Sequence, residues 1–290
     1  MPAHDLVAEN SSFDTLAESL RTHDRDAYIA CLLAPPAQRE ALMALHAFSI
    51  DVGRIPELVS EPMLGEIRLQ WWRDALQQVS GGAPTGNPVA DSLGAAVRDH
   101  DLPLPLLQAM IDARAFDLSG EMMPDDQAMR AYLVKTSGNL IALACRVLDA
   151  GAGREYADLA IAAGQLRGLV RLLRLLPLHL STGRFYLPLQ RFVDAGADVE
   201  RLRAGAADEK ARQVIAELRG EAVRELERLR EAMRALPQVL RPAFLPLATL
   251  QSYLRAMEKE RSAPLVRPAD ISPLNRVWRI ASRAVRGVPV

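Results

Sequence analysis

The sequence predicts a single all-α domain. Apolar residues recur at spacings of three and four along most of the chain, as in Leu42, Leu45, Phe48 and Val52, which is typical of helices with one buried face. No segment alternates apolar and polar residues over a strand length, so no strand is expected. A length of 290 residues with 49% hydrophobic content suffices for a sizeable core.

Prolines and small polar residues predict the helix boundaries. Ser11 or Ser12 is expected to cap a first helix that ends near Thr22. Pro35 and Pro36 then start a helix that Pro56 ends. Further helices are expected over residues 62–79, 88–100, 104–119, 125–149, 155–177, 208–236 and 238–259. The clearest loop is 80–88, and 188–207 is expected to be a turn-rich connection.

The chain divides into three predicted parts. Residues 1–24 form an N-terminal segment with a short helix, residues 25–260 form the domain, and residues 261–290 form a basic amphipathic tail. The loop at 80–88 is not a domain boundary, because the same helical periodicity resumes directly after it.

Composition excludes several classes of protein. A formal net charge of -1 gives no basic surplus for a nucleic-acid partner. Cys31 and Cys145 lack a partner at metal-ligand spacing and form no disulfide framework, which fits a reducing compartment. The N-terminus lacks a basic start followed by an apolar run, so no signal peptide is expected. We therefore expect a cytoplasmic protein.

The longest apolar stretch carries a stripe of arginines. Arg167, Arg171 and Arg174 share one face of a helix, with no acid nearby in sequence. Each would cost roughly 2.5–3.5 kcal/mol near a bilayer centre, so residues 159–180 are not expected to span a membrane. Either the arginines reach solvent or acids of other helices, or they form a wall that faces an anion, since guanidinium groups match phosphate geometry.

Few other motifs indicate chemistry. Asp125 and Asp126 are an adjacent carboxylate pair that either caps a helix or chelates Mg²⁺ on a diphosphate. They follow Pro124 and precede a helical run, which favours capping. The sequence contains no phosphate loop, no nucleophile elbow and no paired histidines at zinc-binding spacing.

The segment Gly183–Pro188, with Gly164-Gln165-Leu166 and Arg174 before it, resembles the second conserved block of the squalene/phytoene synthase family. Residues 67–73 and 112–118 resemble other blocks of that family, and the resemblance spans roughly residues 25–260. It implies a single helical domain of the isoprenoid synthase fold around a central cavity. It also implies a former diphosphate site at Arg54, Glu57, Gln165, Arg171, Arg174, His179 and Tyr186.

The chain departs from the family at the aspartate-rich motifs. The first motif falls on residues 53–57, where Glu57 alone keeps a carboxylate. After Arg174, the positions of the two expected acids are Leu175 and His179. Magnesium needs oxygen ligands to neutralise a departing diphosphate, so we expect no catalytic residue, no metal ligand set and no cofactor. Magnesium would be a cofactor only if the protein were an active enzyme.

Three functional hypotheses follow. The segment 57–73 is similar to a subgroup of the family, the mitochondrial complex I assembly factor, which implies a non-catalytic role with complex I subunits as partners. The alternatives are a head-to-head prenyl transferase and a protein that binds a prenyl diphosphate or phospholipid in the old cavity.

The C-terminal tail adds a membrane hypothesis. Residues 267–290 hold five arginines and one aspartate, a local charge of +4. Helical spacing is expected to place Arg276, Arg279, Arg283 and Arg286 opposite Val277, Ile280 and Ala284. This pattern suits peripheral contact at the inner face of an anionic membrane, or an acidic partner. The alternative is a final helix that packs on the domain.

Overall fold

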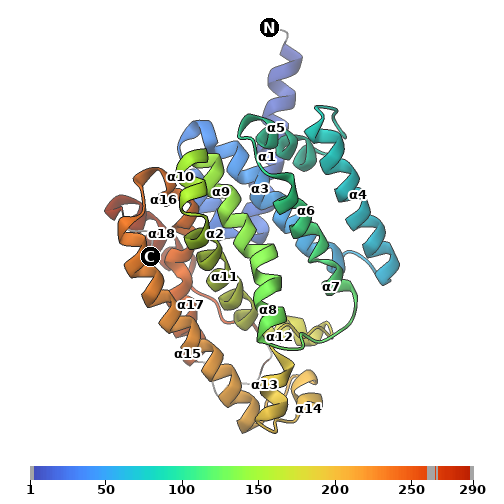
Figure 1. Ribbon diagram of the computed structural model, residues 1–290, viewed down its shortest axis with the longest axis vertical. Helices are drawn as coiled ribbons and strands as arrows, with labels where there is room; N and C mark the ends of the chain where they lie inside the picture. Colours follow the sequence, from blue (N-terminus) through green and yellow to red (C-terminus); the bar gives the residue numbers. More distant parts are fainter. Residues whose placement is uncertain (1–2, 260–264, 266, 288–290) are drawn as a thin grey trace.

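The computed structural model describes residues 3–259, 265 and 267–287, with side chains from residue 12 onward. The elements of this described part are helices and short helical turns, and the predicted all-α class is confirmed (Figure 1). An isolated bridge between Met122 and Phe185 is the extended pairing found there. No helix in these described ranges is long and apolar enough to cross a membrane.

The first third of the chain follows the predicted boundaries closely. Its helices are α1 (Ala3–His23), α2 (Arg25–Leu32), α3 (Pro36–Arg54), α4 (Pro62–Ser80) and α5 (Pro88–Asp99), and a 3-10 turn, η1 (Ile55–Glu57), extends α3. A proline occupies the first position of α3, α4 and α5, where the missing N–H has no helical partner to lose. The prediction that Ser11 or Ser12 caps the first helix is wrong, because α1 already begins at Ala3.

In the middle of the chain, the predicted helices 104–119, 125–149 and 155–177 are each divided into shorter elements. The elements are α6 (Leu104–Asp112), α7 (Ala115–Leu118), α8 (Asp126–Leu133), a π-helical turn η2 (Val134–Gly138), α9 (Asn139–Leu148), α10 (Ala150–Glu155), α11 (Ala157–Arg174) and α12 (Leu176–Ser181). Asp125 caps α8 by accepting a hydrogen bond from the amide of Ala128 at 2.8 Å, which confirms the capping interpretation. Asp126 pairs with Arg191.

The last third contains α13 (Leu189–Asp194), α14 (Val199–Arg203), α15 (Glu209–Ala232), η3 (Met233–Ala235), η4 (Gln238–Leu240), α16 (Arg241–Phe244), η5 (Leu245–Thr249), α17 (Leu250–Lys259) and α18 (Pro273–Arg286). The expected connection over 188–207 therefore contains two short helices. The expected helix over 238–259 is interrupted, because Pro242 and Pro246 lack the amide that a continuous helix needs.

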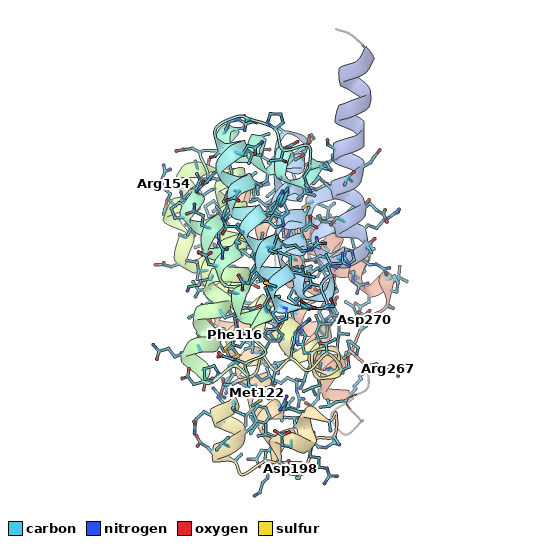
Figure 2. The ribbon with its side chains drawn as sticks, turned by 90° about the vertical axis from the view of Figure 1, so that its right-hand side faces the viewer. Phe116, Met122, Arg154, Asp198, Arg267 and Asp270 are labelled. Carbon is cyan, nitrogen blue, oxygen red and sulfur yellow. The ribbon has the colours of Figure 1, made fainter. Side chains whose placement is uncertain are left out.

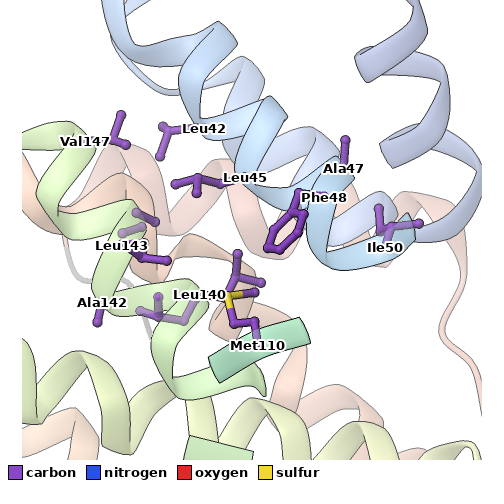
Figure 3. Packing of buried hydrophobic residues seen from close by; sticks show 14 of the residues in the cluster. Leu42, Leu45, Ala47, Phe48, Ile50, Met110, Leu140, Ala142, Leu143 and Val147 are labelled. Carbon is purple, nitrogen blue, oxygen red and sulfur yellow. The ribbon is translucent and has the colours of Figure 1, made fainter. Parts of the chain in front are cut away.

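Helix α11 runs through the middle of the molecule and packs against η2, α9, α15 and α17 (Figure 1). On one side, α3 packs on α9 and α5, and Figure 3 shows Leu45 and Phe48 of α3 facing Leu140 and Leu143 of α9. Phe48 also meets Trp72 of α4 edge to face at 5.2 Å. Burying a side chain of this size stabilises the fold by about 1.5–3 kcal/mol, so this core fixes α3 and α11.

Glycines allow α11 to lie directly on η2. A Cβ atom at Gly164 would collide with the carbonyl oxygen of Ser137, and one at Gly168 would lie 2.6 Å from Leu133 Cδ2. The π-helical turn brings the Ser137–Gly138 backbone against this surface. This close packing fixes the position of α11, and with it the arginine stripe, relative to η2.

The face of α18 predicted from the sequence is wrong. Arg276 and Ile280 were expected on opposite faces, yet both are buried against the domain, because residues four apart share a face of a helix. Ile280 packs with Ala30, Leu245 and Ala248. The part of the predicted tail over 261–264, 266 and 288–290 lies outside the described residues.

Replacing Gly164 with alanine tests the close packing of α11 on η2. We expect Gly164→Ala to lower the free energy of unfolding by about 3 kcal/mol, since the backbone of Ser137 has to move. The matched control is Gly220→Ala in α15, where the nearest atom to the new Cβ lies 3.5 Å away. The control should stabilise the protein by up to about 1 kcal/mol. Urea unfolding measures both, and equal stabilities for the two variants would contradict this packing.

Candidate functional site

A cavity of about 270 Å³ lies between α3, η2, α11 and α12. Predicted site residues that line it are Arg54, Glu57, Arg171, His179 and Tyr186. A second cavity of about 310 Å³ adjoins it and contains Arg174. Asp24, Arg167 and Arg171 border both cavities, so the basic stripe of α11 forms their common wall.

Gln165 does not reach either cavity. Its side chain lines a groove between α8, α11 and α15, and its amide nitrogen lies 3.4 Å from the carbonyl oxygen of Arg130. The reason is helical geometry, because six residues separate Gln165 from Arg171 and turn it about 120° away from that side chain. The expectation that Gln165 belongs to the same site is therefore corrected.

An aspartate from another helix neutralises the basic stripe. Asp24 caps α2, and its second oxygen lies 2.5 Å from Nη2 of Arg167 and 3.9 Å from Nη1 of Arg171. Burial alone would raise the pKa of Asp24, but the two guanidinium groups hold it well below its usual range. Of the two interpretations of the stripe, Arg167 follows the first, since it pairs with an acid of another helix.

The second cavity contains a network of charged side chains that anchors α18. Arg276 donates to Asp26 at 2.9 Å, to Asp270 at 2.9 Å and to the hydroxyl of Tyr253 at 3.1 Å. Arg174 lies over the ring of Tyr253 at 4.7 Å and 3.9 Å from Asp270. The arginines of this cavity are thus held by carboxylates of α2 and of the segment before α18.

A buried triad forms another wall of the first cavity. Arg114 donates to the Tyr132 hydroxyl at 2.7 Å and lies 3.2 Å from Asp117, and Tyr132 donates to Asp117 at 2.9 Å. The ring of Tyr132 lies 5.8 Å from that of Tyr186, whose ring meets His179 at 4.7 Å. This wall has its own hydrogen-bond partners and holds Tyr186 in place.

Residues from α1, α3, η1 and the segment after α12 contact one another beside the first cavity. Arg54 lies 3.3 Å from Glu57 and contacts His23 at 2.8 Å. Arg184 donates to the carbonyl oxygen of Pro56 at 2.7 Å. The carboxylate of Glu57 is therefore already engaged by an arginine.

Two groups in the first cavity lack a close partner among the described residues. The Arg171 side chain is 47% exposed, and its nearest carboxylate is the 3.9 Å contact with Asp24. The Nδ1 atom of His179 is buried without a hydrogen-bond partner in the part of the chain that the structure describes. Burial, with the nearby charges of Arg171 and Arg184, lowers the pKa of His179 to about 3, so its imidazole is neutral near pH 7. This arrangement can accept an anion or a hydrogen-bonding head group.

Within residues 3–259, 265 and 267–287, no group of three or more His, Cys, Asp or Glu side chains lies close enough to hold a metal ion.

Sequence reasoning missed the acids that hold the arginines. Asp24 and Asp26 follow the predicted end of the first helix, and such a position marks an N-cap, which was the available signal. No sequence pattern around Asp270 indicated that it would contact an arginine of another helix. Arg114 and Asp117 lie within residues 112–118, whose resemblance to the family gave no indication of the triad that they form with Tyr132.

Fold and site together define a helical protein built around paired basic cavities. The profile of the squalene/phytoene synthase family matches residues 20–276. The mouse (Mus musculus) protein named NADH dehydrogenase (ubiquinone) complex I, assembly factor 6, is 30% identical over 243 residues, which are 83% of this chain and 72% of that protein. Phytoene synthase of Rhodobacter capsulatus is 24% identical over 285 residues, which are 97% of this chain and 83% of that protein.

Solved structures agree with this match. The crystal structure of a dehydrosqualene synthase in complex with ligand has a TM-score of 0.81 to this chain, covers 96% of both chains and is 14% identical. The predicted isoprenoid synthase fold is therefore confirmed. The chain belongs to the squalene/phytoene synthase family, and it is similar to complex I assembly factors as well as to phytoene synthases.

Replacing Asp24 tests its role as the counter-charge of Arg167. We expect Asp24→Asn to lower the free energy of unfolding by about 3 kcal/mol at pH 7, because Arg167 would stay buried without its ion-pair partner. The folded-state pKa of Asp24 is depressed, so the stabilisation is present above about pH 4 and is lost as the pH falls further. The difference between variant and wild type should therefore shrink in acid.

The matched control is Asp125→Asn, which alters another aspartate N-cap. Asparagine caps a helix about as well as aspartate, so this variant should stay within about 0.5 kcal/mol of the wild type. Chemical denaturation as a function of pH measures both variants. If Asp24→Asn had the same free energy of unfolding as the control, the Asp24–Arg167 pair would not contribute the expected stability.

Proposed function

We propose that this chain is a non-catalytic member of its family that acts in the assembly of respiratory complex I. The similarity to assembly factor 6 of mouse, at 30% identity over 83% of this chain, supports the role. The human protein of the same name is 28% identical over the same share of this chain. Complex I subunits are the proposed partners.

The observation that carries the non-catalytic part is the pairing of the cavity acids. Glu57 pairs with Arg54, Asp24 with Arg167, and Asp117 with Arg114. A carboxylate that already holds a guanidinium at 2.5–3.3 Å must give up that partner to bind Mg²⁺. Because a buried arginine left without its acid is costly, the pairs oppose metal binding.

The residues at the family's aspartate positions support the same proposal. By resemblance, the first motif falls on Gly53 and Arg54 before Glu57, and the second falls on Leu175 and His179. A Cβ at Gly53 would lie 3.3 Å from the Arg114 guanidinium, so this position adjoins a fixed positive charge. We propose that the protein needs no Mg²⁺ and no other cofactor.

The proposed place of action is the cytoplasm, at the inner face of the membrane that holds complex I. The similarity to complex I assembly factors and the basic helix α18 support a place beside that membrane.

Deleting the gene in the organism that carries it tests the assembly role. We expect less assembled complex I on native gels and lower NADH–quinone oxidoreductase activity in membranes, with rescue by the wild-type gene. The purified protein should release no diphosphate from farnesyl or geranylgeranyl diphosphate, with or without Mg²⁺. Rescue by an unrelated phytoene synthase, or Mg²⁺-dependent release that yields a hydrocarbon, would overturn the proposal in favour of the prenyl transferase alternative.

Binding of a prenyl or phospholipid anion in the cavity is the second candidate function. The exposed Arg171 and the unpartnered Nδ1 of His179 favour it, because together they offer a charge and a hydrogen-bonding atom on one wall. Such a ligand would be held through its phosphate group by arginine, which binds phosphate with paired hydrogen bonds.

Calorimetric titration with farnesyl diphosphate in the absence of Mg²⁺ tests this candidate. We expect Arg171→Gln to weaken binding by about tenfold or more, since one charge-assisted contact is lost. The control is Arg154→Gln, because Arg154 is exposed and lies well away from Asp270 of the second cavity (Figure 2). Equal affinities for the two variants would place the ligand elsewhere, and no heat with the wild type would remove this candidate.

A further inference from the structure

Helix α18 exposes an apolar face to solvent. Leu274 is 79% exposed, Trp278 is 66% exposed and Val285 is 88% exposed. Val277 adds a fourth apolar side chain at 48% exposure. The spacings of three, four and seven residues place all four on one side of a 14-residue helix. A large tryptophan in such a row is unusual on a surface that only water covers.

The opposite face fixes α18 to the domain. Arg276 is buried in its bonds to Asp26, Asp270 and Tyr253, and Ile280 packs on α2 and η5. The exposed face therefore has a defined orientation. It is a different face from the one that the sequence predicted, which contained Ile280.

Arginines lie beside this apolar face, along one flank of the helix. At the helical rotation per residue, Arg279 and Arg286 lie about 120–140° around the axis from Leu274. Arg283 lies on the opposite side, near Arg230 of α15, and Arg241 of α16 lies near Gly287 at the helix end. Burial and the like charges of Arg230, Arg279 and Arg286 lower the pKa of Arg283. Helix α18 itself contains no acid. Among the described residues, no carboxylate lies within ion-pair distance of Arg279, Arg283 or Arg286, so the charge of these three arginines is not paired.

We propose that α18 docks on the surface of an anionic phospholipid bilayer, with Leu274, Trp278 and Val285 inserted among the lipids and the flanking Arg279 and Arg286 against the head groups. Tryptophan favours the boundary between hydrocarbon and water, and arginine binds phosphate. A helix of this length lying flat extends about 21 Å along the interface. Apolar and electrostatic contributions act together in such helices.

The charged residues beside the exposed apolar rows of α4 and α18 differ, and this difference favours a bilayer as the partner of α18. The exposed apolar row of α4, which includes Met63 and Ile67, has Glu61 and Glu66 beside it and lacks this surplus of arginines. The row of α18 has Arg279 and Arg286 on its flank and no acid on its own helix, which matches a surface of continuous negative charge. This inference does not rest on the proposed role in complex I assembly.

Flotation of the purified full chain with lipid vesicles tests the proposal. The protein should float with vesicles of phosphatidylcholine mixed with phosphatidylglycerol and remain at the bottom with phosphatidylcholine alone. Added salt should weaken the binding, because the head-group contacts are electrostatic. Equal binding to both vesicle types, or to neither, would overturn the proposal, and the second result would direct the search to an acidic protein partner.

Variants on two exposed rows identify the docking face. Trp278→Glu and Leu274→Glu should each reduce vesicle binding by about tenfold or more, because a carboxylate would enter the lipid interface. Met63→Glu and Ile67→Glu on α4, where the side chains are 67% and 60% exposed, are the matched controls and should bind as the wild type does. Loss of binding in the α4 variants alone would overturn the assignment to α18.

Charge variants separate the electrostatic part. Arg279→Gln and Arg286→Gln should each weaken binding by about fivefold, and Trp278→Phe should retain most of it. Thermal unfolding followed by circular dichroism checks that every variant is folded. Because the altered side chains lie at the surface, their melting temperatures should match the wild type. Undiminished binding in a folded Arg279→Gln/Arg286→Gln protein would contradict the role of charge.

Discussion

The ion pair between Asp24 and Arg167 determines which arginines of the α11 stripe are neutralised inside the protein and which stay exposed. The pair joins residues 143 apart in sequence and is almost fully withdrawn from water. A buried pair of this kind adds little net stability over apolar packing, but breaking it leaves a charge without a partner. It therefore fixes the position of α2 on α11 more than it strengthens the fold.

The same constraint shapes both cavities. Asp24 pairs with Arg167 and lies 3.9 Å from Arg171, and all three residues border both cavities. Arg174 instead contacts Tyr253 and Asp270. Most of the arginine charge is satisfied inside the protein. Relatives of this chain include proteins named as phytoene synthases and proteins named as assembly factors, and one scaffold accommodates both.

The sequence alone predicted the fold class and the boundaries of α3, α4 and α5, because proline and apolar spacing act locally. It did not predict the π-helical turn at η2, which depends on the close approach of Gly164 from a distant helix. It placed Arg54, Glu57, Arg171, His179 and Tyr186 at one site, and these residues line one cavity. It could not supply Asp24 and Asp270 as their neighbours, since no periodicity relates a carboxylate to an arginine on another element.

The shared anchor at Asp270 links the terminal helix to the cavity wall. Its carboxylate bonds Arg276 of α18 and also lies within reach of Arg174, and the Tyr253 side chain contacts the same two arginines. The packing of α18 on the domain and the neutralisation of Arg174 therefore both depend on Asp270. A rearrangement that lifted this helix would leave Arg174 without its acid and give the neighbouring cavity a stronger positive potential, so the two surfaces cannot change independently.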